Sequence, residues 1–260
     1  MKKGKNDIIV LGAGNVAHAL SKELSNKGFN IRGVYSRTTK SARALAKYFS
    51  CEVYADPALI PADASYYLIS VTDEALPEVV ARMPETEGIV MHTAGSIPLS
   101  VLSRFKKYGV LYPLQTLSKN RETDFSIVPL CIEASDKLTL KEIKKIAFSM
   151  SETVVEISSE QRKILHVAAV FACNFSNYMF IAAHDILKRA GMDFKILLPL
   201  IIETVEKLML MEPRQAQTGP AIRGDKTVMH EHQLLLKEMP QYQKLYKTLS
   251  AAIAETLSHS

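Results

Sequence analysis

Asp7-Ile8-Ile9-Val10-Leu11-Gly12-Ala13-Gly14-Asn15-Val16-Ala17 is an apolar strand that runs directly into a glycine turn and the start of a helix. Gly12 permits the tight turn, Gly14 lets the backbone approach a pyrophosphate, and Ala17 still allows the helix to pack closely on the strand. The helix expected from Asn15 to Lys27 would point its unsatisfied N–H groups at the phosphates. The stretch therefore predicts a dinucleotide site contacted by Gly12, Ala13, Gly14, Asn15 and Val16. The alternative is a glycine turn that only packs.

A second strand, expected over Phe29–Tyr35, ends in Ser36-Arg37-Thr38. An NAD enzyme usually carries Asp or Glu at this point, because a carboxylate accepts a hydrogen bond from the ribose 2′-hydroxyl. Two hydroxyls and a guanidinium would instead donate to a 2′-phosphate. The motif predicts NADP(H) as the cofactor, with Ser36, Arg37 and Thr38 as contacts. Alternatively, Arg37, Lys40 and Arg43 are solvated charges on a helix that Thr38 or Thr39 caps.

Strand-like and helical stretches alternate through the first half of the chain. Buried strands are expected over Ser65–Val71 and Gly88–His92, and helices over Ser41–Phe49, from Thr72 onward, over Leu99–Lys107 and over Asp136–Met150. This rhythm predicts an α/β Rossmann domain, doubly wound around a mainly parallel sheet. Ligands of such sheets bind at the carboxyl ends of strands, so Val71, Thr72, Thr93, Ala94 and Gly95 are expected to line the nicotinamide end of the site. Asp73 is expected to cap a helix or to contact the ligand.

The second half of the chain is helical. Helices are expected near 159–190, 193–212, 226–237 and 240–257, separated by glycines and prolines. We therefore expect two domains, a Rossmann domain over 1–157 and an all-α domain over 158–260, the latter for substrate binding or dimerisation.

Composition excludes several classes of function. The net charge of +5 over 260 residues includes no stripe of Lys and Arg interleaved with aromatics, so no nucleic-acid partner is expected. Three separated cysteines, Cys51, Cys131 and Cys173, fit a reducing cytoplasm and indicate neither disulfides nor zinc. No apolar signal core precedes the first strand. The membrane-like stretch Ile164–Ala183 carries polar residues and has charged flanks, which favours a helix buried between protein surfaces over a membrane span.

Candidate catalytic residues lie in the helical half. His166 and Asn174 are polar positions on an otherwise apolar helix, although such residues are often satisfied core groups. Arg223, in the loop Thr218–Asp225, could bind a substrate carboxylate. Its alternative role is a rigid turn in which Arg223 pairs with Asp225 and Asp225 caps the next helix. No metal site is expected, since His230-Glu231-His232 is too closely spaced for one helix face.

The chain resembles a family that joins a Rossmann-like NADP-binding domain to a C-terminal domain of unknown function, related to the C-terminal fold of 6-phosphogluconate dehydrogenase. The resemblance rests on Gly12-Ala13-Gly14, Ser36-Arg37-Thr38, Thr93-Ala94-Gly95-Ser96, Tyr112-Pro113-Leu114-Gln115-Thr116, the helix from His166 to Asn174, and Thr218-Gly219-Pro220 with Arg223-Gly224-Asp225. Where this chain has Tyr112 the family typically has His, so the resemblance carries no proton-transfer role to that position.

The first half is also similar to pyrroline-5-carboxylate reductase and to the deazaflavin-linked NADP reductases. The resemblance implies hydride transfer between NADP(H) and a small acceptor, and a homodimer formed through the helical domain. The function expected is an NADP(H)-dependent oxidoreductase acting on a small anionic carbonyl or imine compound, with His166, Asn174 and Arg223 as the catalytic residues. The alternative is a non-catalytic NADP-binding regulator or sensor, because the sequence holds no unambiguous acid–base pair.

Overall fold

The computed structural model describes residues 6–256, and the chain divides into two compact units, Met1–Asn174 and Phe175–Ser260. The first unit holds the whole sheet, which ends with β8 (Val154–Glu156), just before the expected domain change at 157/158. The division between the compact units falls further along, inside the long helix that follows.

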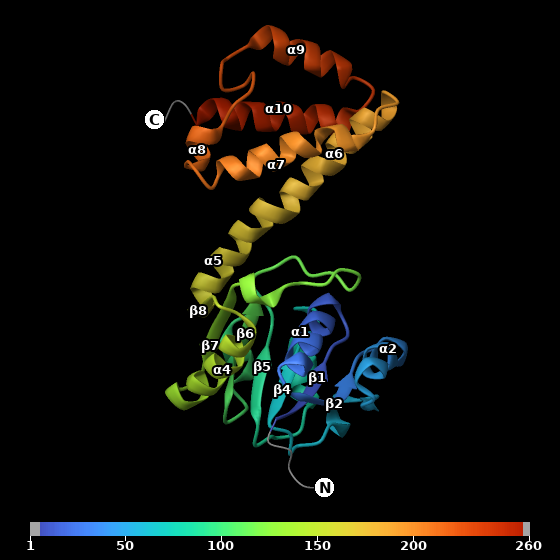
Figure 1. The fold of residues 1–260 in the computed structure, drawn as a ribbon, viewed down its shortest axis with the longest axis vertical. Helices are drawn as coiled ribbons and strands as arrows, with labels where there is room; N and C mark the ends of the chain where they lie inside the picture. Colours follow the sequence, from blue (N-terminus) through green and yellow to red (C-terminus); the bar gives the residue numbers. More distant parts are fainter. Residues whose placement is uncertain (1–5, 257–260) are drawn as a thin grey trace. The chain divides into compact units, whose positions relative to one another are not determined.

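Eight strands of the described chain form one sheet in the order β3-β2-β1-β4-β5-β6-β7-β8 (Figure 1). Strands β1 to β6 are parallel, β7 pairs antiparallel with β6, and β8 is parallel to β7. The strand order reverses between β1 and β4, which is the switch point where doubly wound sheets bind ligands. The mainly parallel Rossmann sheet predicted from the sequence is confirmed. The strands are β1 (Asp7–Leu11), β2 (Asn30–Tyr35), β3 (Glu52–Tyr54), β4 (Tyr66–Ile69), β5 (Ile89–His92), β6 (Tyr108–Pro113) and β7 (Leu130–Ala134).

Helices cover both faces of the sheet because successive strand residues point to opposite sides. Ile8 and Val10 of β1 pack in one core with α1 (Asn15–Asn26), α2 (Thr39–Phe49) and α4 (Lys137–Met150). Figure 1 shows α1 and α4 on this same side. Ile9 and Leu11 pack in a second core with α3 (Leu76–Arg82) and Phe105. Burial on both faces explains why these strands are continuously apolar.

Two helices expected in the first half of the chain differ in the structure. Instead of a helix over Leu99–Lys107 there is a 3₁₀ turn, Leu99–Leu102, closed by a hydrogen bond from the Val101 N–H to the Pro98 carbonyl. Val101 and the serines beside it are weak helix formers, so this short connection does not become an α-helix. The helix expected from Thr72 begins at Leu76, and the residue at its N-cap is Ala75. Asp73 therefore does not cap it.

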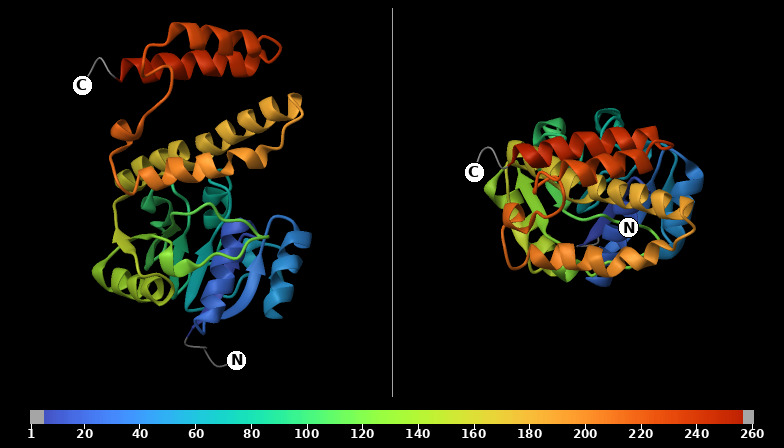
Figure 2. Two further views of the ribbon diagram at one scale, coloured as in Figure 1. Left: turned by 45° about the horizontal axis from the view of Figure 1, so that its top comes forward. Right: turned by 90° about the horizontal axis from the view of Figure 1, so that it is seen from above.

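The long helix continues from the first unit into the second. It comprises α5 (Ser159–Ala169), a π-helical segment (Val170–Phe175) and α6 (Ser176–Arg189). The helical unit contains a small core of Ala182, Leu236 and Tyr242. In it α9 and α10 lie side by side (Figure 2). Its remaining elements are a 3₁₀ turn (Phe194–Leu197), α7 (Leu198–Lys207), α8 (Pro213–Ala216), α9 (Lys226–Leu235) and α10 (Pro240–Glu255). The single helix expected over 193–212 is thus replaced by the 3₁₀ turn and α7.

By length and composition alone, one helix of the described chain could cross a membrane. It is Ser159–Arg189, 31 residues long, with a mean hydropathy of 1.5 over its most apolar window, which is exposed in the single chain.

Candidate functional site

A cavity of about 560 Å³ opens at the carboxyl ends of β1, β2 and β4, at the switch point of the sheet. Its size lies in the range of small-molecule sites. It brings together most of the residues expected to bind the cofactor, and Ser41, Ser70 and Arg82 join them. The predicted residues that line it are Gly12, Ala13, Gly14, Ser36, Arg37, Thr38, Val71 and Thr72. Asn15, Val16, Thr93, Ala94 and Gly95 do not line this cavity.

The two glycines of the turn differ in what surrounds them. Gly12 has a φ of +123°, and a Cβ atom there would meet the carbonyl oxygen of Ser70 at 2.1 Å. Only glycine lets β1 end this close to the end of β4. At Gly14 a Cβ would meet no protein atom within 4 Å. The open side of Gly14 faces the cavity, as required where backbone approaches a diphosphate.

Helix α1 begins without a side-chain cap. Gly14 occupies its N-cap position, and no acidic residue lies in its first turn. The first N–H groups of a helix have no partner within the helix, and a phosphate can accept from them while the helix dipole favours its charge. Ala17 is fully buried, which confirms the close packing of this helix on the sheet.

Gly14→Ala is expected to leave the fold intact and to weaken NADPH binding. The backbone at Gly14 has a φ of −79°, which alanine adopts without strain, so the free energy of unfolding should change by less than about 1 kcal/mol. The added methyl group would occupy the open space where the diphosphate is expected, and we therefore expect at least about tenfold weaker NADPH binding, or roughly 1.4 kcal/mol. Urea denaturation and calorimetric titration measure the two effects. Unchanged affinity would contradict a diphosphate at this turn.

At the end of β2, where the adenosine ribose is expected, Arg37 lines the cavity and has no partner in the described chain. Its side chain forms no ion pair or hydrogen bond with any residue between 6 and 256. Arg82, which also lines the cavity, is instead paired with Asp56 and lies 3.7 Å from Glu78. Thr38 sits at the N-cap position of α2, but its hydroxyl donates to Ser41 at 2.8 Å and caps no backbone N–H. Arg37 is therefore the group available to a 2′-phosphate.

The loop after β5 is held by side chains from three elements. Thr93 is buried, and its hydroxyl donates to Ser70 Oγ at 3.0 Å. The Ala94 N–H donates to His92 Nδ1 at 3.1 Å. Arg162 of α5 donates to the carbonyl oxygens of Ala94, at 3.2 Å, and Ile97, at 2.6 Å. This loop is thus rigid at the edge of the sheet where the nicotinamide end of the site is expected.

Arg162 is 1% exposed and pairs with Glu133 of β7, its Nη1 lying 2.5 Å from Glu133 Oε2. Glu133 also accepts from the hydroxyl and the N–H of Ser159, at the start of α5. The ion pair therefore joins the long helix, β7 and the loop after β5. Asp73 accepts a hydrogen bond from Ser96 of that loop.

His166 lies against this loop from the next turn of α5. Its Nδ1 is 3.0 Å from the hydroxyl of Tyr112, at the end of β6. A Cβ atom on Gly95 would meet the His166 Nδ1 at 2.6 Å, so Gly95 makes room for the imidazole. The structure thus brings His166 to Gly95, two of the residues predicted from the sequence, and adds Tyr112.

The other catalytic candidates are placed differently. Asn174 is exposed in the π-helical segment, eight residues beyond His166, or about 12 Å along a helix. Arg223 is exposed in a turn of the helical unit. Asp225 caps α9 by accepting from the Val228 N–H at 3.1 Å, as the alternative interpretation of this loop expected. No ion pair joins Arg223 to Asp225 among the residues that the structure describes.

His92, at the end of β5, makes the free energy of unfolding of the protein depend on pH. Burial lowers the pKa of His92 to about 3, and the neighbouring Arg162 charge acts in the same direction. An unfolded histidine titrates near 6.5, so between about pH 6.5 and 3 the unfolded chain binds a proton that the folded chain does not. The free energy of unfolding should therefore fall as the pH is lowered through this window, by up to about 1.4 kcal/mol per pH unit. Denaturation of wild type and His92→Asn at pH 7 and 5 tests this, and equal losses in both would contradict it.

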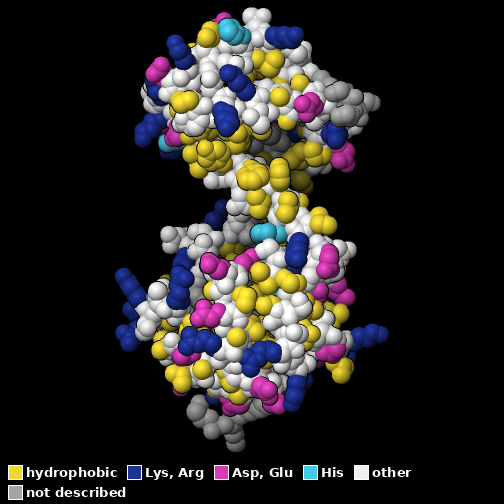
Figure 3. Space-filling model, turned by 180° about the vertical axis from the view of Figure 1, so that it is seen from behind, with side chains coloured by type: hydrophobic (Ala, Val, Ile, Leu, Met, Phe, Trp, Pro, Cys, Tyr) yellow, Lys and Arg dark blue, Asp and Glu magenta, His cyan; other side chains and the backbone are white. Residues whose placement is uncertain are grey.

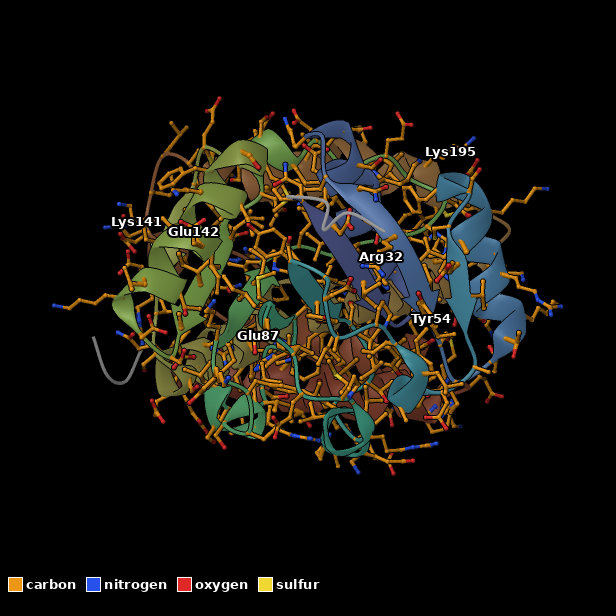
Figure 4. The ribbon with its side chains drawn as sticks, turned by 90° about the horizontal axis from the view of Figure 1, so that it is seen from below. Arg32, Tyr54, Glu87, Lys141, Glu142 and Lys195 are labelled. Atoms are coloured by element: carbon orange, nitrogen blue, oxygen red, sulfur yellow. The ribbon has the colours of Figure 1, made fainter. Side chains whose placement is uncertain are left out.

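A second cavity, of about 580 Å³, lies at the opposite edge of the sheet, where strands begin. Figure 4 looks onto this edge and labels Glu87 and Glu142, which line the cavity from different elements. Lys106 there is 3.4 Å from Glu87, so its charge is compensated. Binding at the carboxyl ends of strands favours the first cavity as the functional one. Within residues 6–256 no three His, Cys, Asp or Glu side chains lie close enough together to hold a metal ion.

Comparisons with known proteins agree with this geometry. The family model described as NADP oxidoreductase, coenzyme F420-dependent, matches residues 7–95. The model of the domain of unknown function DUF2520 matches residues 128–253. No curated protein matches the chain.

Among solved structures, the chain is similar to a Bacteroides fragilis protein provisionally assigned as an NADP oxidoreductase. The two are 45% identical over 96% of this chain and 98% of that chain, with a TM-score of 0.90. A reductive aminase from Aspergillus terreus, solved with NADPH and ethyl levulinate, is 10% identical over 99% and 95% of the two chains, with a TM-score of 0.74. A 1-pyrroline-5-carboxylate reductase from Streptococcus pyogenes is 12% identical over 96% and 98%, with a TM-score of 0.63. The last two share the fold.

Proposed function

Because this chain belongs to a family of NADP oxidoreductases and binds NADP, we propose that it transfers a hydride between NADP(H) and a small substrate. The substrate we propose is an anionic carbonyl or imine compound. In this family a Rossmann-like domain is joined to the domain of unknown function DUF2520. The observation that supports this most directly is the pair of His166 and Tyr112 against Gly95. This pair puts groups able to carry a proton at the edge of the sheet where the nicotinamide end is expected.

The residues of the chain have separate roles in this proposal. NADPH, when bound, supplies the hydride, and the protein supplies binding, orientation and protons. The Gly12–Gly14 turn binds the diphosphate of the coenzyme, and Arg37 binds the 2′-phosphate on its adenosine ribose. His166 donates to the oxygen of a carbonyl substrate, whereas a protonated imine needs no acid. The substrate-binding roles of Asn174 and Arg223 stay predictions from the sequence, with Arg223 as a group able to bind a carboxylate.

The test uses purified protein with NADPH and a panel of 2-oxo acids and cyclic imines. We expect NADPH oxidation with at least one of them, and a fall in kcat of about 100-fold or more in His166→Gln for a carbonyl substrate. Tight NADPH binding without turnover on any compound would contradict the proposal and favour the NADP-binding sensor.

We further propose that the protein forms a homodimer through the helical unit. The core of that unit is small, and Leu198, Ile202 and Val205 form an exposed apolar stripe along α7. Figure 3 shows hydrophobic side chains gathered on the surface of this unit. Apolar surface of this extent usually meets a partner. We also propose, from the resemblance noted in the sequence, that the helical unit is related to the C-terminal fold of 6-phosphogluconate dehydrogenase.

Sedimentation is expected to give twice the chain mass of 28.9 kDa, without detergent. Ile202→Glu places a charge on the exposed stripe and should shift the protein to the monomer. Lys207→Glu, a charge change at the end of the same helix, is the control. A monomeric wild type, or a wild type that stays in solution only with detergent or lipid, would contradict the dimer. We also propose a cytoplasmic location, which the free thiols of Cys51, Cys131 and Cys173 support.

A further inference from the structure

The environment of the His166 ring is asymmetric. Its Nδ1 edge is enclosed by Gly95 and by the hydroxyl of Tyr112, which is 3.0 Å away. Tyr112 itself is only 9% exposed. Nδ1 is therefore committed to a contact inside the protein, and Nε2 is the nitrogen left to meet a ligand.

The proton of the Tyr112 hydroxyl decides the tautomer of His166. Burial raises the pKa of Tyr112, so the phenol stays protonated at neutral pH. His166 Nδ1 is the single hydrogen-bond partner of this hydroxyl among the residues the structure describes. If Nδ1 carried the proton, it would donate to the Tyr112 oxygen. The Tyr112 O–H would then be a buried donor without an acceptor, which costs free energy. Tyr112 therefore donates, Nδ1 accepts, and the imidazole proton lies on Nε2.

We propose that Tyr112 is a positioning residue that fixes His166 as the Nε2–H tautomer, so that the site recognises an oxygen acceptor, a carbonyl or carboxylate oxygen, at this point. This inference rests on the proposed function and names the chemistry that His166 selects. A protonated imine would bring its own N–H toward Nε2–H, and two donors facing each other repel. A neutral imidazole that donates from Nε2 is also known to polarise carbonyl groups in enzymes.

For a carbonyl substrate the protons balance. Bound NADPH would supply the hydride to the carbonyl carbon, and the developing alkoxide oxygen would take the proton from His166 Nε2. Nδ1 then takes the hydroxyl proton of Tyr112, so the imidazole stays neutral and the negative charge ends on the phenolate. The cycle closes when a solvent proton reaches Nε2 and Nδ1 returns its proton to the phenolate, which restores the Tyr112 hydroxyl and the Nε2–H tautomer. The phenol is by far a stronger acid than the alcohol formed, so the transfer is favourable even though burial raises the pKa of Tyr112.

The tautomer is measured directly by ¹⁵N–¹H NMR of the histidine rings in the full chain, with and without NADP⁺, at neutral pH. The loss of signals in His166→Gln assigns the ring. We expect an unprotonated Nδ1 and a protonated Nε2 in wild type, and a mixture of tautomers in Tyr112→Phe. Tyr67→Phe is the matched control, because it removes another buried hydroxyl, bonded to the Pro61 carbonyl at 2.7 Å, and should leave His166 unchanged.

A protonated Nδ1 in wild type, or a Tyr112→Phe spectrum with the wild-type tautomer, would overturn this inference. Neither outcome depends on turnover. If the tautomer is as expected and no compound is reduced, the proposed function alone fails; if compounds are reduced and Nδ1 is protonated, the role of Tyr112 alone fails. With a carbonyl substrate, Tyr112→Phe should lower kcat about tenfold or more and change KM little.

Discussion

Glu133→Gln is expected to lower the free energy of unfolding by about 3 kcal/mol, because it removes one partner of a buried ion pair. Arg162 is 1% exposed, and Glu133 is its carboxylate partner at 2.5 Å. Glutamine keeps the shape but leaves a buried guanidinium without a counter-charge. Urea denaturation measures the loss.

A matched control comes from the surface of the same domain. Glu156 pairs with Lys144, and both side chains are nearly half exposed. Since exposed pairs contribute little, Glu156→Gln should cost less than about 1 kcal/mol. Combining Glu133→Gln with Arg162→Met should cost less than the sum of the single changes, because the uncompensated charge is removed. Equal, small effects of Glu133→Gln and Glu156→Gln would show that the buried pair does not hold the long helix to the sheet.

Arg37→Ala is expected to weaken NADPH binding by about 30-fold to 100-fold, or roughly 2 to 3 kcal/mol, while NADH binding changes little. Arg37 lines the cavity and has no partner in the described chain, so its charge is available to the 2′-phosphate. Arg37→Lys should recover part of the affinity, since lysine keeps the charge but loses the planar fork. Calorimetric titration with both coenzymes gives the ratio.

Arg43→Ala is the control for overall charge. Arg43 is exposed on α2, six residues after Arg37, and does not line the cavity. Its removal changes the net charge by the same amount and should alter NADPH affinity less than about threefold, because charges beyond the site are screened by salt. Equal effects of the two variants would mean that the overall positive charge of this region, and not a direct contact with Arg37, selects NADPH.

The fold could be predicted from the sequence where the pattern is local and strong. Ile8 to Leu11 followed by Gly12 and Gly14 fixes a strand, a turn and a helix within a few residues, and the sheet confirms it. The helix expected over Leu99–Lys107 was wrong because a stretch of moderate propensity, followed closely by β6, has no local signal that distinguishes a 3₁₀ turn from a helix.

The site was predictable only in part. Residues next to the glycine turn and at the end of β2 belong to known local patterns, so their gathering around one cavity follows from the strand order. Arg162 and Glu133 were missed, because their ion pair joins positions 29 residues apart and Arg162 reaches the Ala94 carbonyl 68 residues away. His92 was missed because its local pattern does not show its burial near Arg162. The one signal in the sequence was Arg162 itself, a cation four residues before His166 and hence on the same helix face.

Calorimetric titration of the wild-type protein with NADPH and with NADH is the most direct test of the central claim, that a dinucleotide diphosphate rests on the Gly12–Gly14 turn with its 2′-phosphate at Arg37. We expect NADPH to bind at least about tenfold more tightly than NADH. Equal affinities would contradict the role of Arg37, and no heat from either coenzyme would contradict the site itself.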